Sequence, residues 1–147
     1  MGSRHFRAGV VIVVRRDDNH VLAFERADQP GQWQLPQGGI QPGETPDQAA
    51  WRELGEETGL GPDKVDLIGE HPAWVAYEWP PEVIAGGNRL GQVQRWFFFR
   101  VRDGTIAPVP DGREFRAWRW AEPAWLIDQV VPFRRPAYET VLGPRPA

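Results

Sequence analysis

The segment Thr45–Thr58 carries the clearest helix signal in the chain. Its first residue can cap the helix, Pro46 suits the first turn, and Gln48 completes a capping box. Gly59 stands where helices commonly end, because glycine adopts the left-handed conformation without strain. The sequence therefore predicts a helix with defined ends, to which the rest of the chain must fit.

Three glutamates lie within this helix. Because successive helical residues are rotated by ~100°, Glu53, Glu56 and Glu57 fall within one arc of about 100°. Like charges one turn apart destabilise a helix by a few tenths of a kcal/mol. A divalent cation is the natural way to offset that repulsion, since Mg²⁺ prefers carboxylate oxygens. Taken alone, however, a solvated acidic face is the commoner outcome, so the surrounding residues must decide.

The other side chains of the helix indicate which of its faces packs against the core. Ala49 and Ala50 are expected to project into the same arc, one turn earlier, where small side chains leave room for phosphate and hydrated metal. Trp51 and Leu54 point the other way and are expected to anchor the helix to the core. Arg52 can hold a carboxylate in place through a charge-assisted hydrogen bond.

The rest of the chain mixes strands and helices without a βαβ rhythm. We therefore expect an α/β (α+β) fold, a mixed sheet flanked by helices, in one domain spanning residues 1–147. Strands are predicted at Ala8–Arg15, His20–Arg26, Val65–Glu70, Trp74–Trp79, Gln94–Val101 and Phe115–Trp120, with a short extended stretch at Trp33–Leu35. Two short helices are predicted at Pro123–Val130 and Phe133–Leu142, and loops at Pro36–Glu44 and Pro80–Gln92.

Composition excludes several functional classes. The chain has no cysteine, which rules out thiol catalysis, disulfides and cysteine-bound zinc, and is compatible with a cytoplasmic location. The net charge of −3 argues against a protein that coats nucleic acid. No apolar run approaches the ~18 residues of a membrane span, so no membrane partner is expected. The three histidines lack the spacing of metal ligands.

The stretch GGIQPGETPDQAAWRELGEETGL, residues 38–60, resembles the Nudix box, G-x5-E-x7-R-E-U-x-E-E-x-G-U with U aliphatic. A chance match of every specified position has a probability on the order of one in ten million. The resemblance implies a Nudix hydrolase: a mixed sheet between helices, and a loop-helix-loop that binds Mg²⁺, with Mn²⁺ as a substitute. The matching positions are Gly38, Glu44, Arg52, Glu53, Leu54, Glu56, Glu57, Gly59 and Leu60.

By position, the resemblance makes the helix glutamates the metal ligands, with help from the backbone of Gly38. It makes Arg52 the residue that orients carboxylates, and Glu44 a brace for the loop. The implied chemistry agrees with the residues, because anhydride hydrolysis needs neutralised phosphate oxygens and an activated water. One of the helix glutamates, or one from another loop, would act as general base.

Further stretches are similar to bacterial RNA pyrophosphohydrolases and dinucleoside polyphosphate hydrolases: Trp33-Gln34-Leu35-Pro36-Gln37-Gly38-Gly39, Gly91-Gln92-x-Gln94-Arg95-Trp96-Phe97, Glu114-Phe115-x-x-Trp118-x-Trp120 and Val131-x-Phe133-Arg134-Arg135. This likeness makes Glu114 a further metal ligand or base. It implies that Phe133 stacks on a nucleobase, with core packing an equal alternative, and that Arg134 lies near phosphate or base. Arg7, Arg26 and Tyr77 are the remaining candidates for substrate binding.

The leading interpretation is an enzyme that cleaves a phosphoanhydride bond in a dinucleoside polyphosphate, such as diadenosine tetraphosphate, or at a 5′-triphosphate RNA end. The segment Phe6-Arg7-Ala8-Gly9 is two residues shorter than in the RNA-processing members. This places Arg7 short of the 5′ phosphates and leans slightly toward the small nucleotide. The alternatives are a nucleoside triphosphate pyrophosphohydrolase that cleans the nucleotide pool and a non-catalytic nucleotide sensor.

Overall fold

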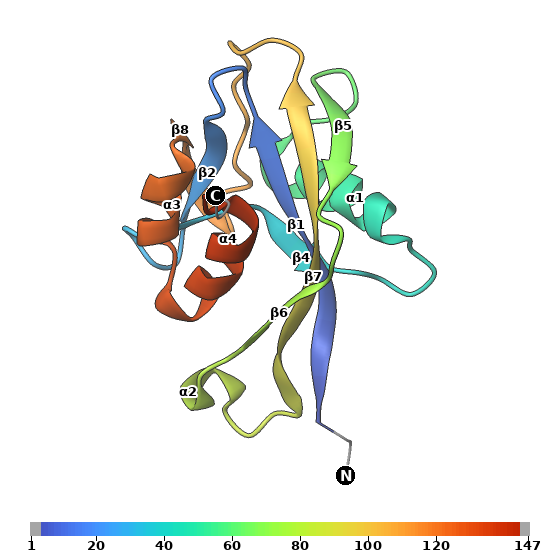
Figure 1. The fold of residues 1–147 in the computed structure, drawn as a ribbon, viewed down its shortest axis with the longest axis vertical. Coiled ribbons are helices and arrows are strands. Elements are labelled where there is room, and N and C mark those ends of the chain that lie inside the picture. Colours follow the sequence, from blue (N-terminus) through green and yellow to red (C-terminus); the bar gives the residue numbers. More distant parts are fainter. Residues whose placement is uncertain (1–3, 145–147) are drawn as a thin grey trace.

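The computed structural model describes residues 4–144, which form one mixed sheet with helices on both faces (Figure 1). Two long strands run side by side through its centre, β1 (His5–Arg15) and β7 (Arg89–Val101), and they pair in parallel. Such a pair is covered on both faces. That burial explains why Val10 to Val14 is uninterrupted by polar residues, and all five of these side chains are buried.

Shorter strands extend the sheet around this central pair, all through antiparallel pairing. The path through the sheet is β3-β2-β1-β7-β5; in addition β4 pairs with β1, β6 with β7, and β8 with β2. The bounds are β2 (Val21–Arg26), β3 (Trp33–Gln34), β4 (Gln37–Gly39), β5 (Val65–Glu70), β6 (Val75–Glu78) and β8 (Phe115–Ala121). The predicted fold class, a mixed sheet between helices, is confirmed.

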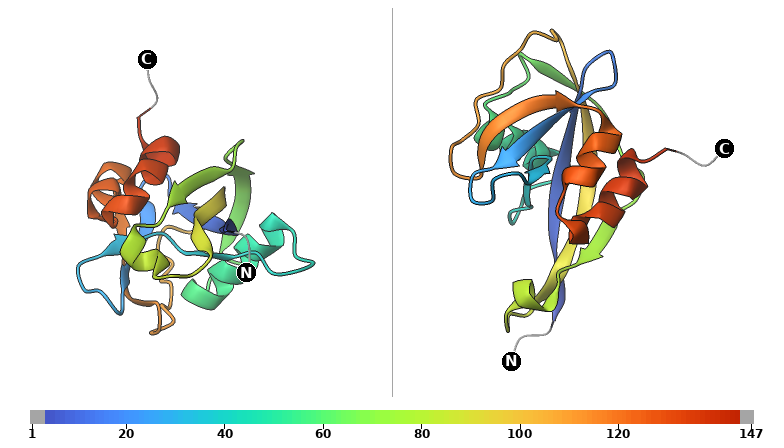
Figure 2. Two further views of the ribbon diagram at one scale, coloured as in Figure 1. Left: turned by 90° about the horizontal axis from the view of Figure 1, so that it is seen from below. Right: turned by 90° about the vertical axis from the view of Figure 1, so that its left-hand side faces the viewer.

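Helix α1 (Pro46–Thr58) covers one face of the sheet, and α3 (Pro123–Gln129) and α4 (Arg135–Leu142) cover the other (Figure 2). A single 3₁₀ turn (Pro132–Arg134) joins α3 to α4. Each interface has its own apolar cluster, with Leu54 and Phe99 on the α1 side and Trp96 and Tyr138 on the α3–α4 side. Strands β1, β6 and β7 and the short α2 (Pro81–Ile84) extend below this body in Figure 1.

The ends of α1 are those predicted. The Thr45 hydroxyl accepts a hydrogen bond from the backbone N–H of Gln48 at 3.4 Å, and the Gln48 side chain accepts one from the backbone N–H of Thr45 at 3.0 Å. Gly59 ends the helix with φ 73°, a left-handed conformation that favours glycine.

Two segments predicted to be loops contain regular structure. Gln37–Gly39 forms β4 and pairs with Gly9–Val11 of β1, because backbone pairing needs no apolar side chains. Within Pro80–Gln92, the structure has α2 and the start of β7, where pairing with β1 extends a strand that the side-chain pattern places later. Both differences arise from contacts between distant segments.

Two alanines of α1 were also predicted wrongly. Ala49 and Ala50 are fully buried in the apolar cluster beneath the helix, so they do not line a space for phosphate. Their small size instead lets the helix backbone pack closely on the sheet. Leu54 is buried in the same cluster, and Trp51 packs edge-on against Phe99 at 4.8 Å between ring centroids, as an anchor should.

Candidate active site

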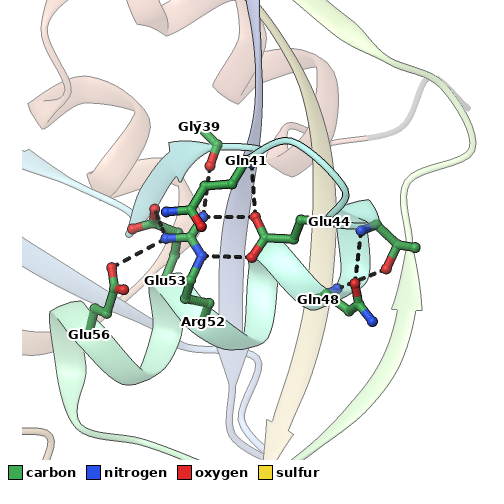
Figure 3. Close-up of polar contacts among 8 residues, drawn as sticks. Gly39, Gln41, Glu44, Gln48, Arg52, Glu53 and Glu56 are labelled. Atoms are coloured by element: carbon green, nitrogen blue, oxygen red, sulfur yellow. Dashed lines mark hydrogen bonds and ion pairs between the residues drawn. The ribbon is translucent and has the colours of Figure 1, made fainter.

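Arg52, in the middle of α1, is the centre of an ion-pair network drawn in Figure 3. Its guanidinium donates to both carboxylate oxygens of Glu44, at 2.7 and 2.9 Å, and to the carbonyl oxygen of Gly39 at 2.9 Å. Its remaining terminal nitrogen donates to Glu53 at 2.8 Å and to Glu56 at 3.3 Å. We call Arg52, Glu44 and Gly39 the Arg52 clamp, because together they join the loop to the helix.

Glu44 braces the loop, as predicted. It accepts a hydrogen bond from the backbone N–H of Gln41 at 3.0 Å in addition to the fork from Arg52. These hydrogen bonds favour the ionised carboxylate, so they lower the pKa of Glu44 to about 2. The clamp is therefore ionised and paired across the physiological range.

Glu57 has the opposite environment. Its residue is only 3% exposed, and its carboxylate accepts one backbone N–H, from Gln37 at 3.2 Å. Burial, followed by the negative charges of Glu114 and Glu53, raises the pKa of Glu57 to about 11. Burial also raises the pKa of Glu53, against the opposing effect of Arg52. We call Glu53, Glu57 and Glu114 the inner carboxylates.

The inner carboxylates fit a divalent cation. Among residues 4–144, no lysine, arginine or histidine forms an ion pair with Glu57, so no cationic side chain would compensate the charge of this buried group once it ionised. Buried carboxylates normally have a cationic partner or bind a metal. The carbonyl and carboxylate oxygens gathered here are also the donors that hard cations prefer.

Glu56 lies apart from the other two helix glutamates. Its side chain is 59% exposed and reaches back to Arg52, so the predicted convergence of three helix carboxylates is incomplete in this structure. Within the described part of the chain, no three acidic or histidine side chains are drawn together as a ready-made metal cage. Arg52 accounts for this arrangement, because it holds Glu53 and Glu56 by ion pairs.

Gly38 and Gly39 provide the space that the site needs. A Cβ atom on Gly38 would overlap the Glu53 carboxylate, and one on Gly39 would overlap the guanidinium of Arg7. Both charged groups therefore lie directly against the backbone of β4. Any larger residue at either position would displace one of them.

A cavity of about 490 Å³ opens beside the inner carboxylates. Glu53, Glu114 and the Gly38 backbone line one part of it, and Arg7, Arg26 and Arg134 line another, with the remaining walls from Asp28, Gln34, Gln37, Trp79, Gln92, Arg113 and Phe115. Arg7 is present although its segment is short, because β1 extends to His5 and places Arg7 beside Gln92. The cavity thus combines acidic groups that suit a cation with arginines that suit phosphate.

Arg134 is positioned by buried partners. It is 8% exposed and donates to the side-chain oxygen of Gln34 at 2.5 Å and to the Tyr77 hydroxyl at 3.3 Å. Tyr77 is itself buried and faces Phe133 at 6.0 Å between ring centroids. Neither aromatic ring lines the cavity, and Phe133 packs against the α3–α4 apolar cluster. In this structure both rings contact Arg134, Tyr77 through its hydroxyl and Phe133 through its face.

Sequence reasoning missed several residues of the site. Gln34, Gln92 and Gln94 are buried amides, and Gln94 donates to Gln92 at 3.1 Å and to Gln37 at 3.3 Å. The signal was visible, because glutamines interrupt apolar strands in the quoted Gly-Gln-x-Gln stretch.

The loop that carries Glu114 is held by Asp111, another residue that the sequence did not indicate. Asp111 accepts backbone N–H bonds from Arg113, Glu114 and Phe115 at 3.0 to 3.1 Å. Its carboxylate therefore fixes the turn that presents Glu114 to the cavity.

This chain matches the NUDIX domain family over residues 5–141. The chain belongs to the Nudix family, and it is a Nudix pyrophosphohydrolase, an enzyme that cleaves phosphoanhydride bonds in nucleotide-linked substrates. Nudix hydrolases generally use divalent metal ions. No helix between residues 4 and 144 is long and apolar enough to cross a membrane.

Curated relatives share about two fifths of their residues with this chain. An RNA pyrophosphohydrolase of Cereibacter sphaeroides is 40% identical over 97% of this chain and 91% of its own, and one of Zymomonas mobilis is 40% identical over 97% and 96%. Nudix hydrolase 25 of Arabidopsis thaliana is 39% identical over 93% and 84%.

Solved structures show the same fold at lower identity. The E. coli dihydroneopterin triphosphate pyrophosphohydrolase has a TM-score of 0.75 at 22% identity, over 95% of this chain and 98% of its own. A C. elegans Ap4A hydrolase binary complex has a TM-score of 0.67 at 19% identity, over 84% and 85%.

Proposed function

We propose that this enzyme hydrolyses 5′-triphosphate RNA ends in a Mg²⁺-dependent reaction that releases pyrophosphate and leaves a 5′-monophosphate. The observation that carries the proposal is the single cavity with Glu53 and Glu114 in one part and Arg7, Arg26 and Arg134 in another. Arg7, the residue in doubt for an RNA end, lines this cavity, which supports the proposal. The curated relatives named RNA pyrophosphohydrolase support the same substrate.

The proposed metal ligands are the helix glutamates, Glu53, Glu56 and Glu57, together with the Gly38 backbone and Glu114. We take Mg²⁺ as the metal ion. Mn²⁺ can substitute for it, because carboxylate oxygens coordinate both ions. When bound, the metal supplies positive charge to the phosphate oxygens and lowers the pKa of a bound water. Glu56 has to turn from Arg52 to join the other two, and its exposure leaves it free to do so.

The chain's own residues do the remaining work. Arg7, Arg26 and Arg134 are proposed to bind the phosphates and to balance their charge as the anhydride breaks. Glu57 or Glu114 takes one proton from the attacking water, whose oxygen forms the new bond to phosphorus while the bridging oxygen leaves with pyrophosphate. Arg52 keeps Glu53 oriented throughout.

A second candidate substrate is a dinucleoside polyphosphate such as diadenosine tetraphosphate. The observation that favours it is a further cavity, described below, which meets the first at Arg7 and Glu53. A non-catalytic sensor is disfavoured because no glutamate of the Nudix box is missing. We assign the same protein to the cytoplasm, where such substrates occur.

A parallel substrate assay tests this proposal. Initial rates would be compared for 5′-triphosphate RNA, diadenosine tetraphosphate and a nucleoside triphosphate, each with Mg²⁺ and with Mn²⁺. We expect pyrophosphate release from RNA to be fastest, and the nucleoside triphosphate to be the slowest substrate. Cleavage of the nucleoside triphosphate at the highest rate would overturn the RNA assignment.

A pair of glutamine variants locates the reaction. Glu57→Gln is expected to remove turnover of every substrate, whereas Glu82→Gln, a matched change at an exposed position of α2, should leave the rates unchanged. Wild-type rates for Glu57→Gln in Mg²⁺ would refute the site.

A further inference from the structure

A second cavity lies next to the candidate active site. It has a volume of about 410 Å³ and shares only Arg7 and Glu53 with the first cavity. Side chains alternate along a strand, so Phe6 and Ala8 leave β1 on the face opposite to Arg7. Phe6 and Ala8 line the second cavity, and Arg7 reaches both cavities across Gly39. The two cavities are therefore joined at the residues proposed to bind phosphate and metal.

The walls of this second cavity suit a nucleoside and a phosphate. Phe6 is 37% exposed, which leaves part of its ring open for a base to stack on. Arg89 begins β7, pairs in register with His5, and lines the same cavity. A volume of this size lies within the range of small-molecule sites, about 300–1,000 Å³.

The arginines of this cavity differ in what they have left to bind. Arg52 is occupied by the Arg52 clamp and by two further carboxylates. Within residues 4–144, Arg7 and Arg89 form no ion pair with any carboxylate. Two cationic groups thus remain available for anions, one at the junction of the cavities and one beyond it.

The chemistry of the candidate substrates differs in a way that this arrangement can distinguish. In a 5′-triphosphate RNA, every nucleoside lies on one side of the phosphate chain. In a dinucleoside polyphosphate, a nucleoside lies at each end. With a cavity on either side of Arg7 and Glu53, the site offers each nucleoside of the second kind of molecule a place to bind.

We propose that the second cavity binds the distal nucleoside of a dinucleoside polyphosphate, with Phe6 stacking on its base and Arg89 contacting the phosphate next to it. This inference rests on the proposed anhydride hydrolysis at the inner carboxylates. It adds a specificity site to that reaction: Phe6 and Arg89 contact the part of the substrate that RNA lacks.

Steady-state kinetics with two matched substrates test the proposal. Diadenosine tetraphosphate and adenosine 5′-tetraphosphate share a phosphate chain and differ by one nucleoside. We expect Phe6→Ala to lower kcat/KM for the dinucleotide by about 10-fold, as for loss of one base stack, and to leave the mononucleotide within about twofold. Phe6→Tyr should retain the wild-type ratio. Val83→Ala is the control, since Val83 is 45% exposed but lies outside the cavity.

Two results would overturn the inference. An equal loss for both substrates would show that Phe6 only shapes the cleft, and a selective loss for 5′-triphosphate RNA would show that the RNA body lies there instead. Arg89→Gln should follow Phe6→Ala in its substrate selectivity.

The inference can also be judged without turnover. The affinities of the same variants for the two adenosine compounds would be measured by calorimetry in the presence of a chelator. If the wild-type enzyme cleaves neither 5′-triphosphate RNA nor diadenosine tetraphosphate, the proposed function fails. An unchanged affinity of Phe6→Ala for the dinucleotide would separately contradict binding of the distal nucleoside in the second cavity.

Discussion

The Arg52 clamp and the inner carboxylates are in direct contact through the Arg52–Glu53 ion pair, yet their carboxyl groups have opposite electrostatic environments. In the clamp, Glu44 is matched by a forked guanidinium, and its pKa falls to about 2. In the inner group, Glu57 is buried beside like charges, and its pKa rises to about 11. The clamp stabilises the fold, whereas the inner group opposes it. A chain retains such an unfavourable cluster where function requires it.

The largest effect is expected from Glu57→Gln. The change removes a proposed ligand and base, so kcat should fall by at least about 100-fold. Without metal at neutral pH, the wild type must protonate Glu57 when it folds, a cost that glutamine avoids, so the melting temperature should rise. Activity assays together with thermal melts in a chelator check both halves. A variant that loses activity and also melts lower would contradict the view that this glutamate costs stability.

Arg52→Gln should disrupt the Arg52 clamp. Glu44 would lose its cationic partner, and Glu53 would lose the group that orients it. We expect a melting temperature lower by about 5 °C together with reduced kcat. Arg52→Lys, which keeps the charge but not the fork, should recover only part of the stability. Thermal melts would show the clamp to be dispensable if both variants matched the wild type.

The two regions should also differ in how stability depends on pH. Glu44 has a folded pKa of about 2 against an ordinary value of 4.5, so its contribution is present above pH 4.5 and is lost as pH falls toward 2. Glu57 has a raised folded pKa, so the metal-free protein loses stability as pH rises from 4.5 toward 11.

Denaturant unfolding across pH, compared with Glu44→Gln and Glu57→Gln, isolates each effect. Subtracting the Glu44→Gln curve from that of the wild type should leave a loss at acid pH. Subtracting the Glu57→Gln curve should leave a loss at higher pH. If the contributions of Glu44 and Glu57 to the free energy of unfolding changed with pH in the same direction, the predicted difference between the two regions would be refuted.

The smallest effect is expected from Glu56→Gln. This side chain is largely exposed and its ion pair with Arg52 is long, so the free energy of unfolding should change by less than about 0.5 kcal/mol. Metal affinity should nevertheless weaken if Glu56 turns inward as a ligand. Unchanged affinity in a metal titration would remove Glu56 from the proposed ligand set.

The sequence predicted α1 well because its signals are local. Thr45, Gln48 and Gly59 define the ends through contacts within one turn, and the spacing of the glutamates follows from helix geometry. The direction of Ala49 was wrong because the buried face of a helix depends on where the sheet packs. Periodicity within the helix cannot supply that information.

The positions that depend on distant contacts were the hardest to predict. Arg134 is held by Gln34, which lies 100 residues earlier, and Gln94 contacts Gln37 across 57 residues. No local pattern encodes such pairs. The likeness to the Nudix family suggested Arg134 as a substrate contact, but only the fold shows which amide and hydroxyl position it.

Metal binding tests the central claim most directly. Mn²⁺ would be titrated calorimetrically at neutral pH into the wild type and Glu57→Gln, in two buffers of different ionisation enthalpy. The account predicts that the wild type binds Mn²⁺ and releases a proton, because Glu57 is protonated before the cation arrives, and that the variant binds far more weakly with little proton release. Equal affinity and equal proton release in both proteins would contradict it.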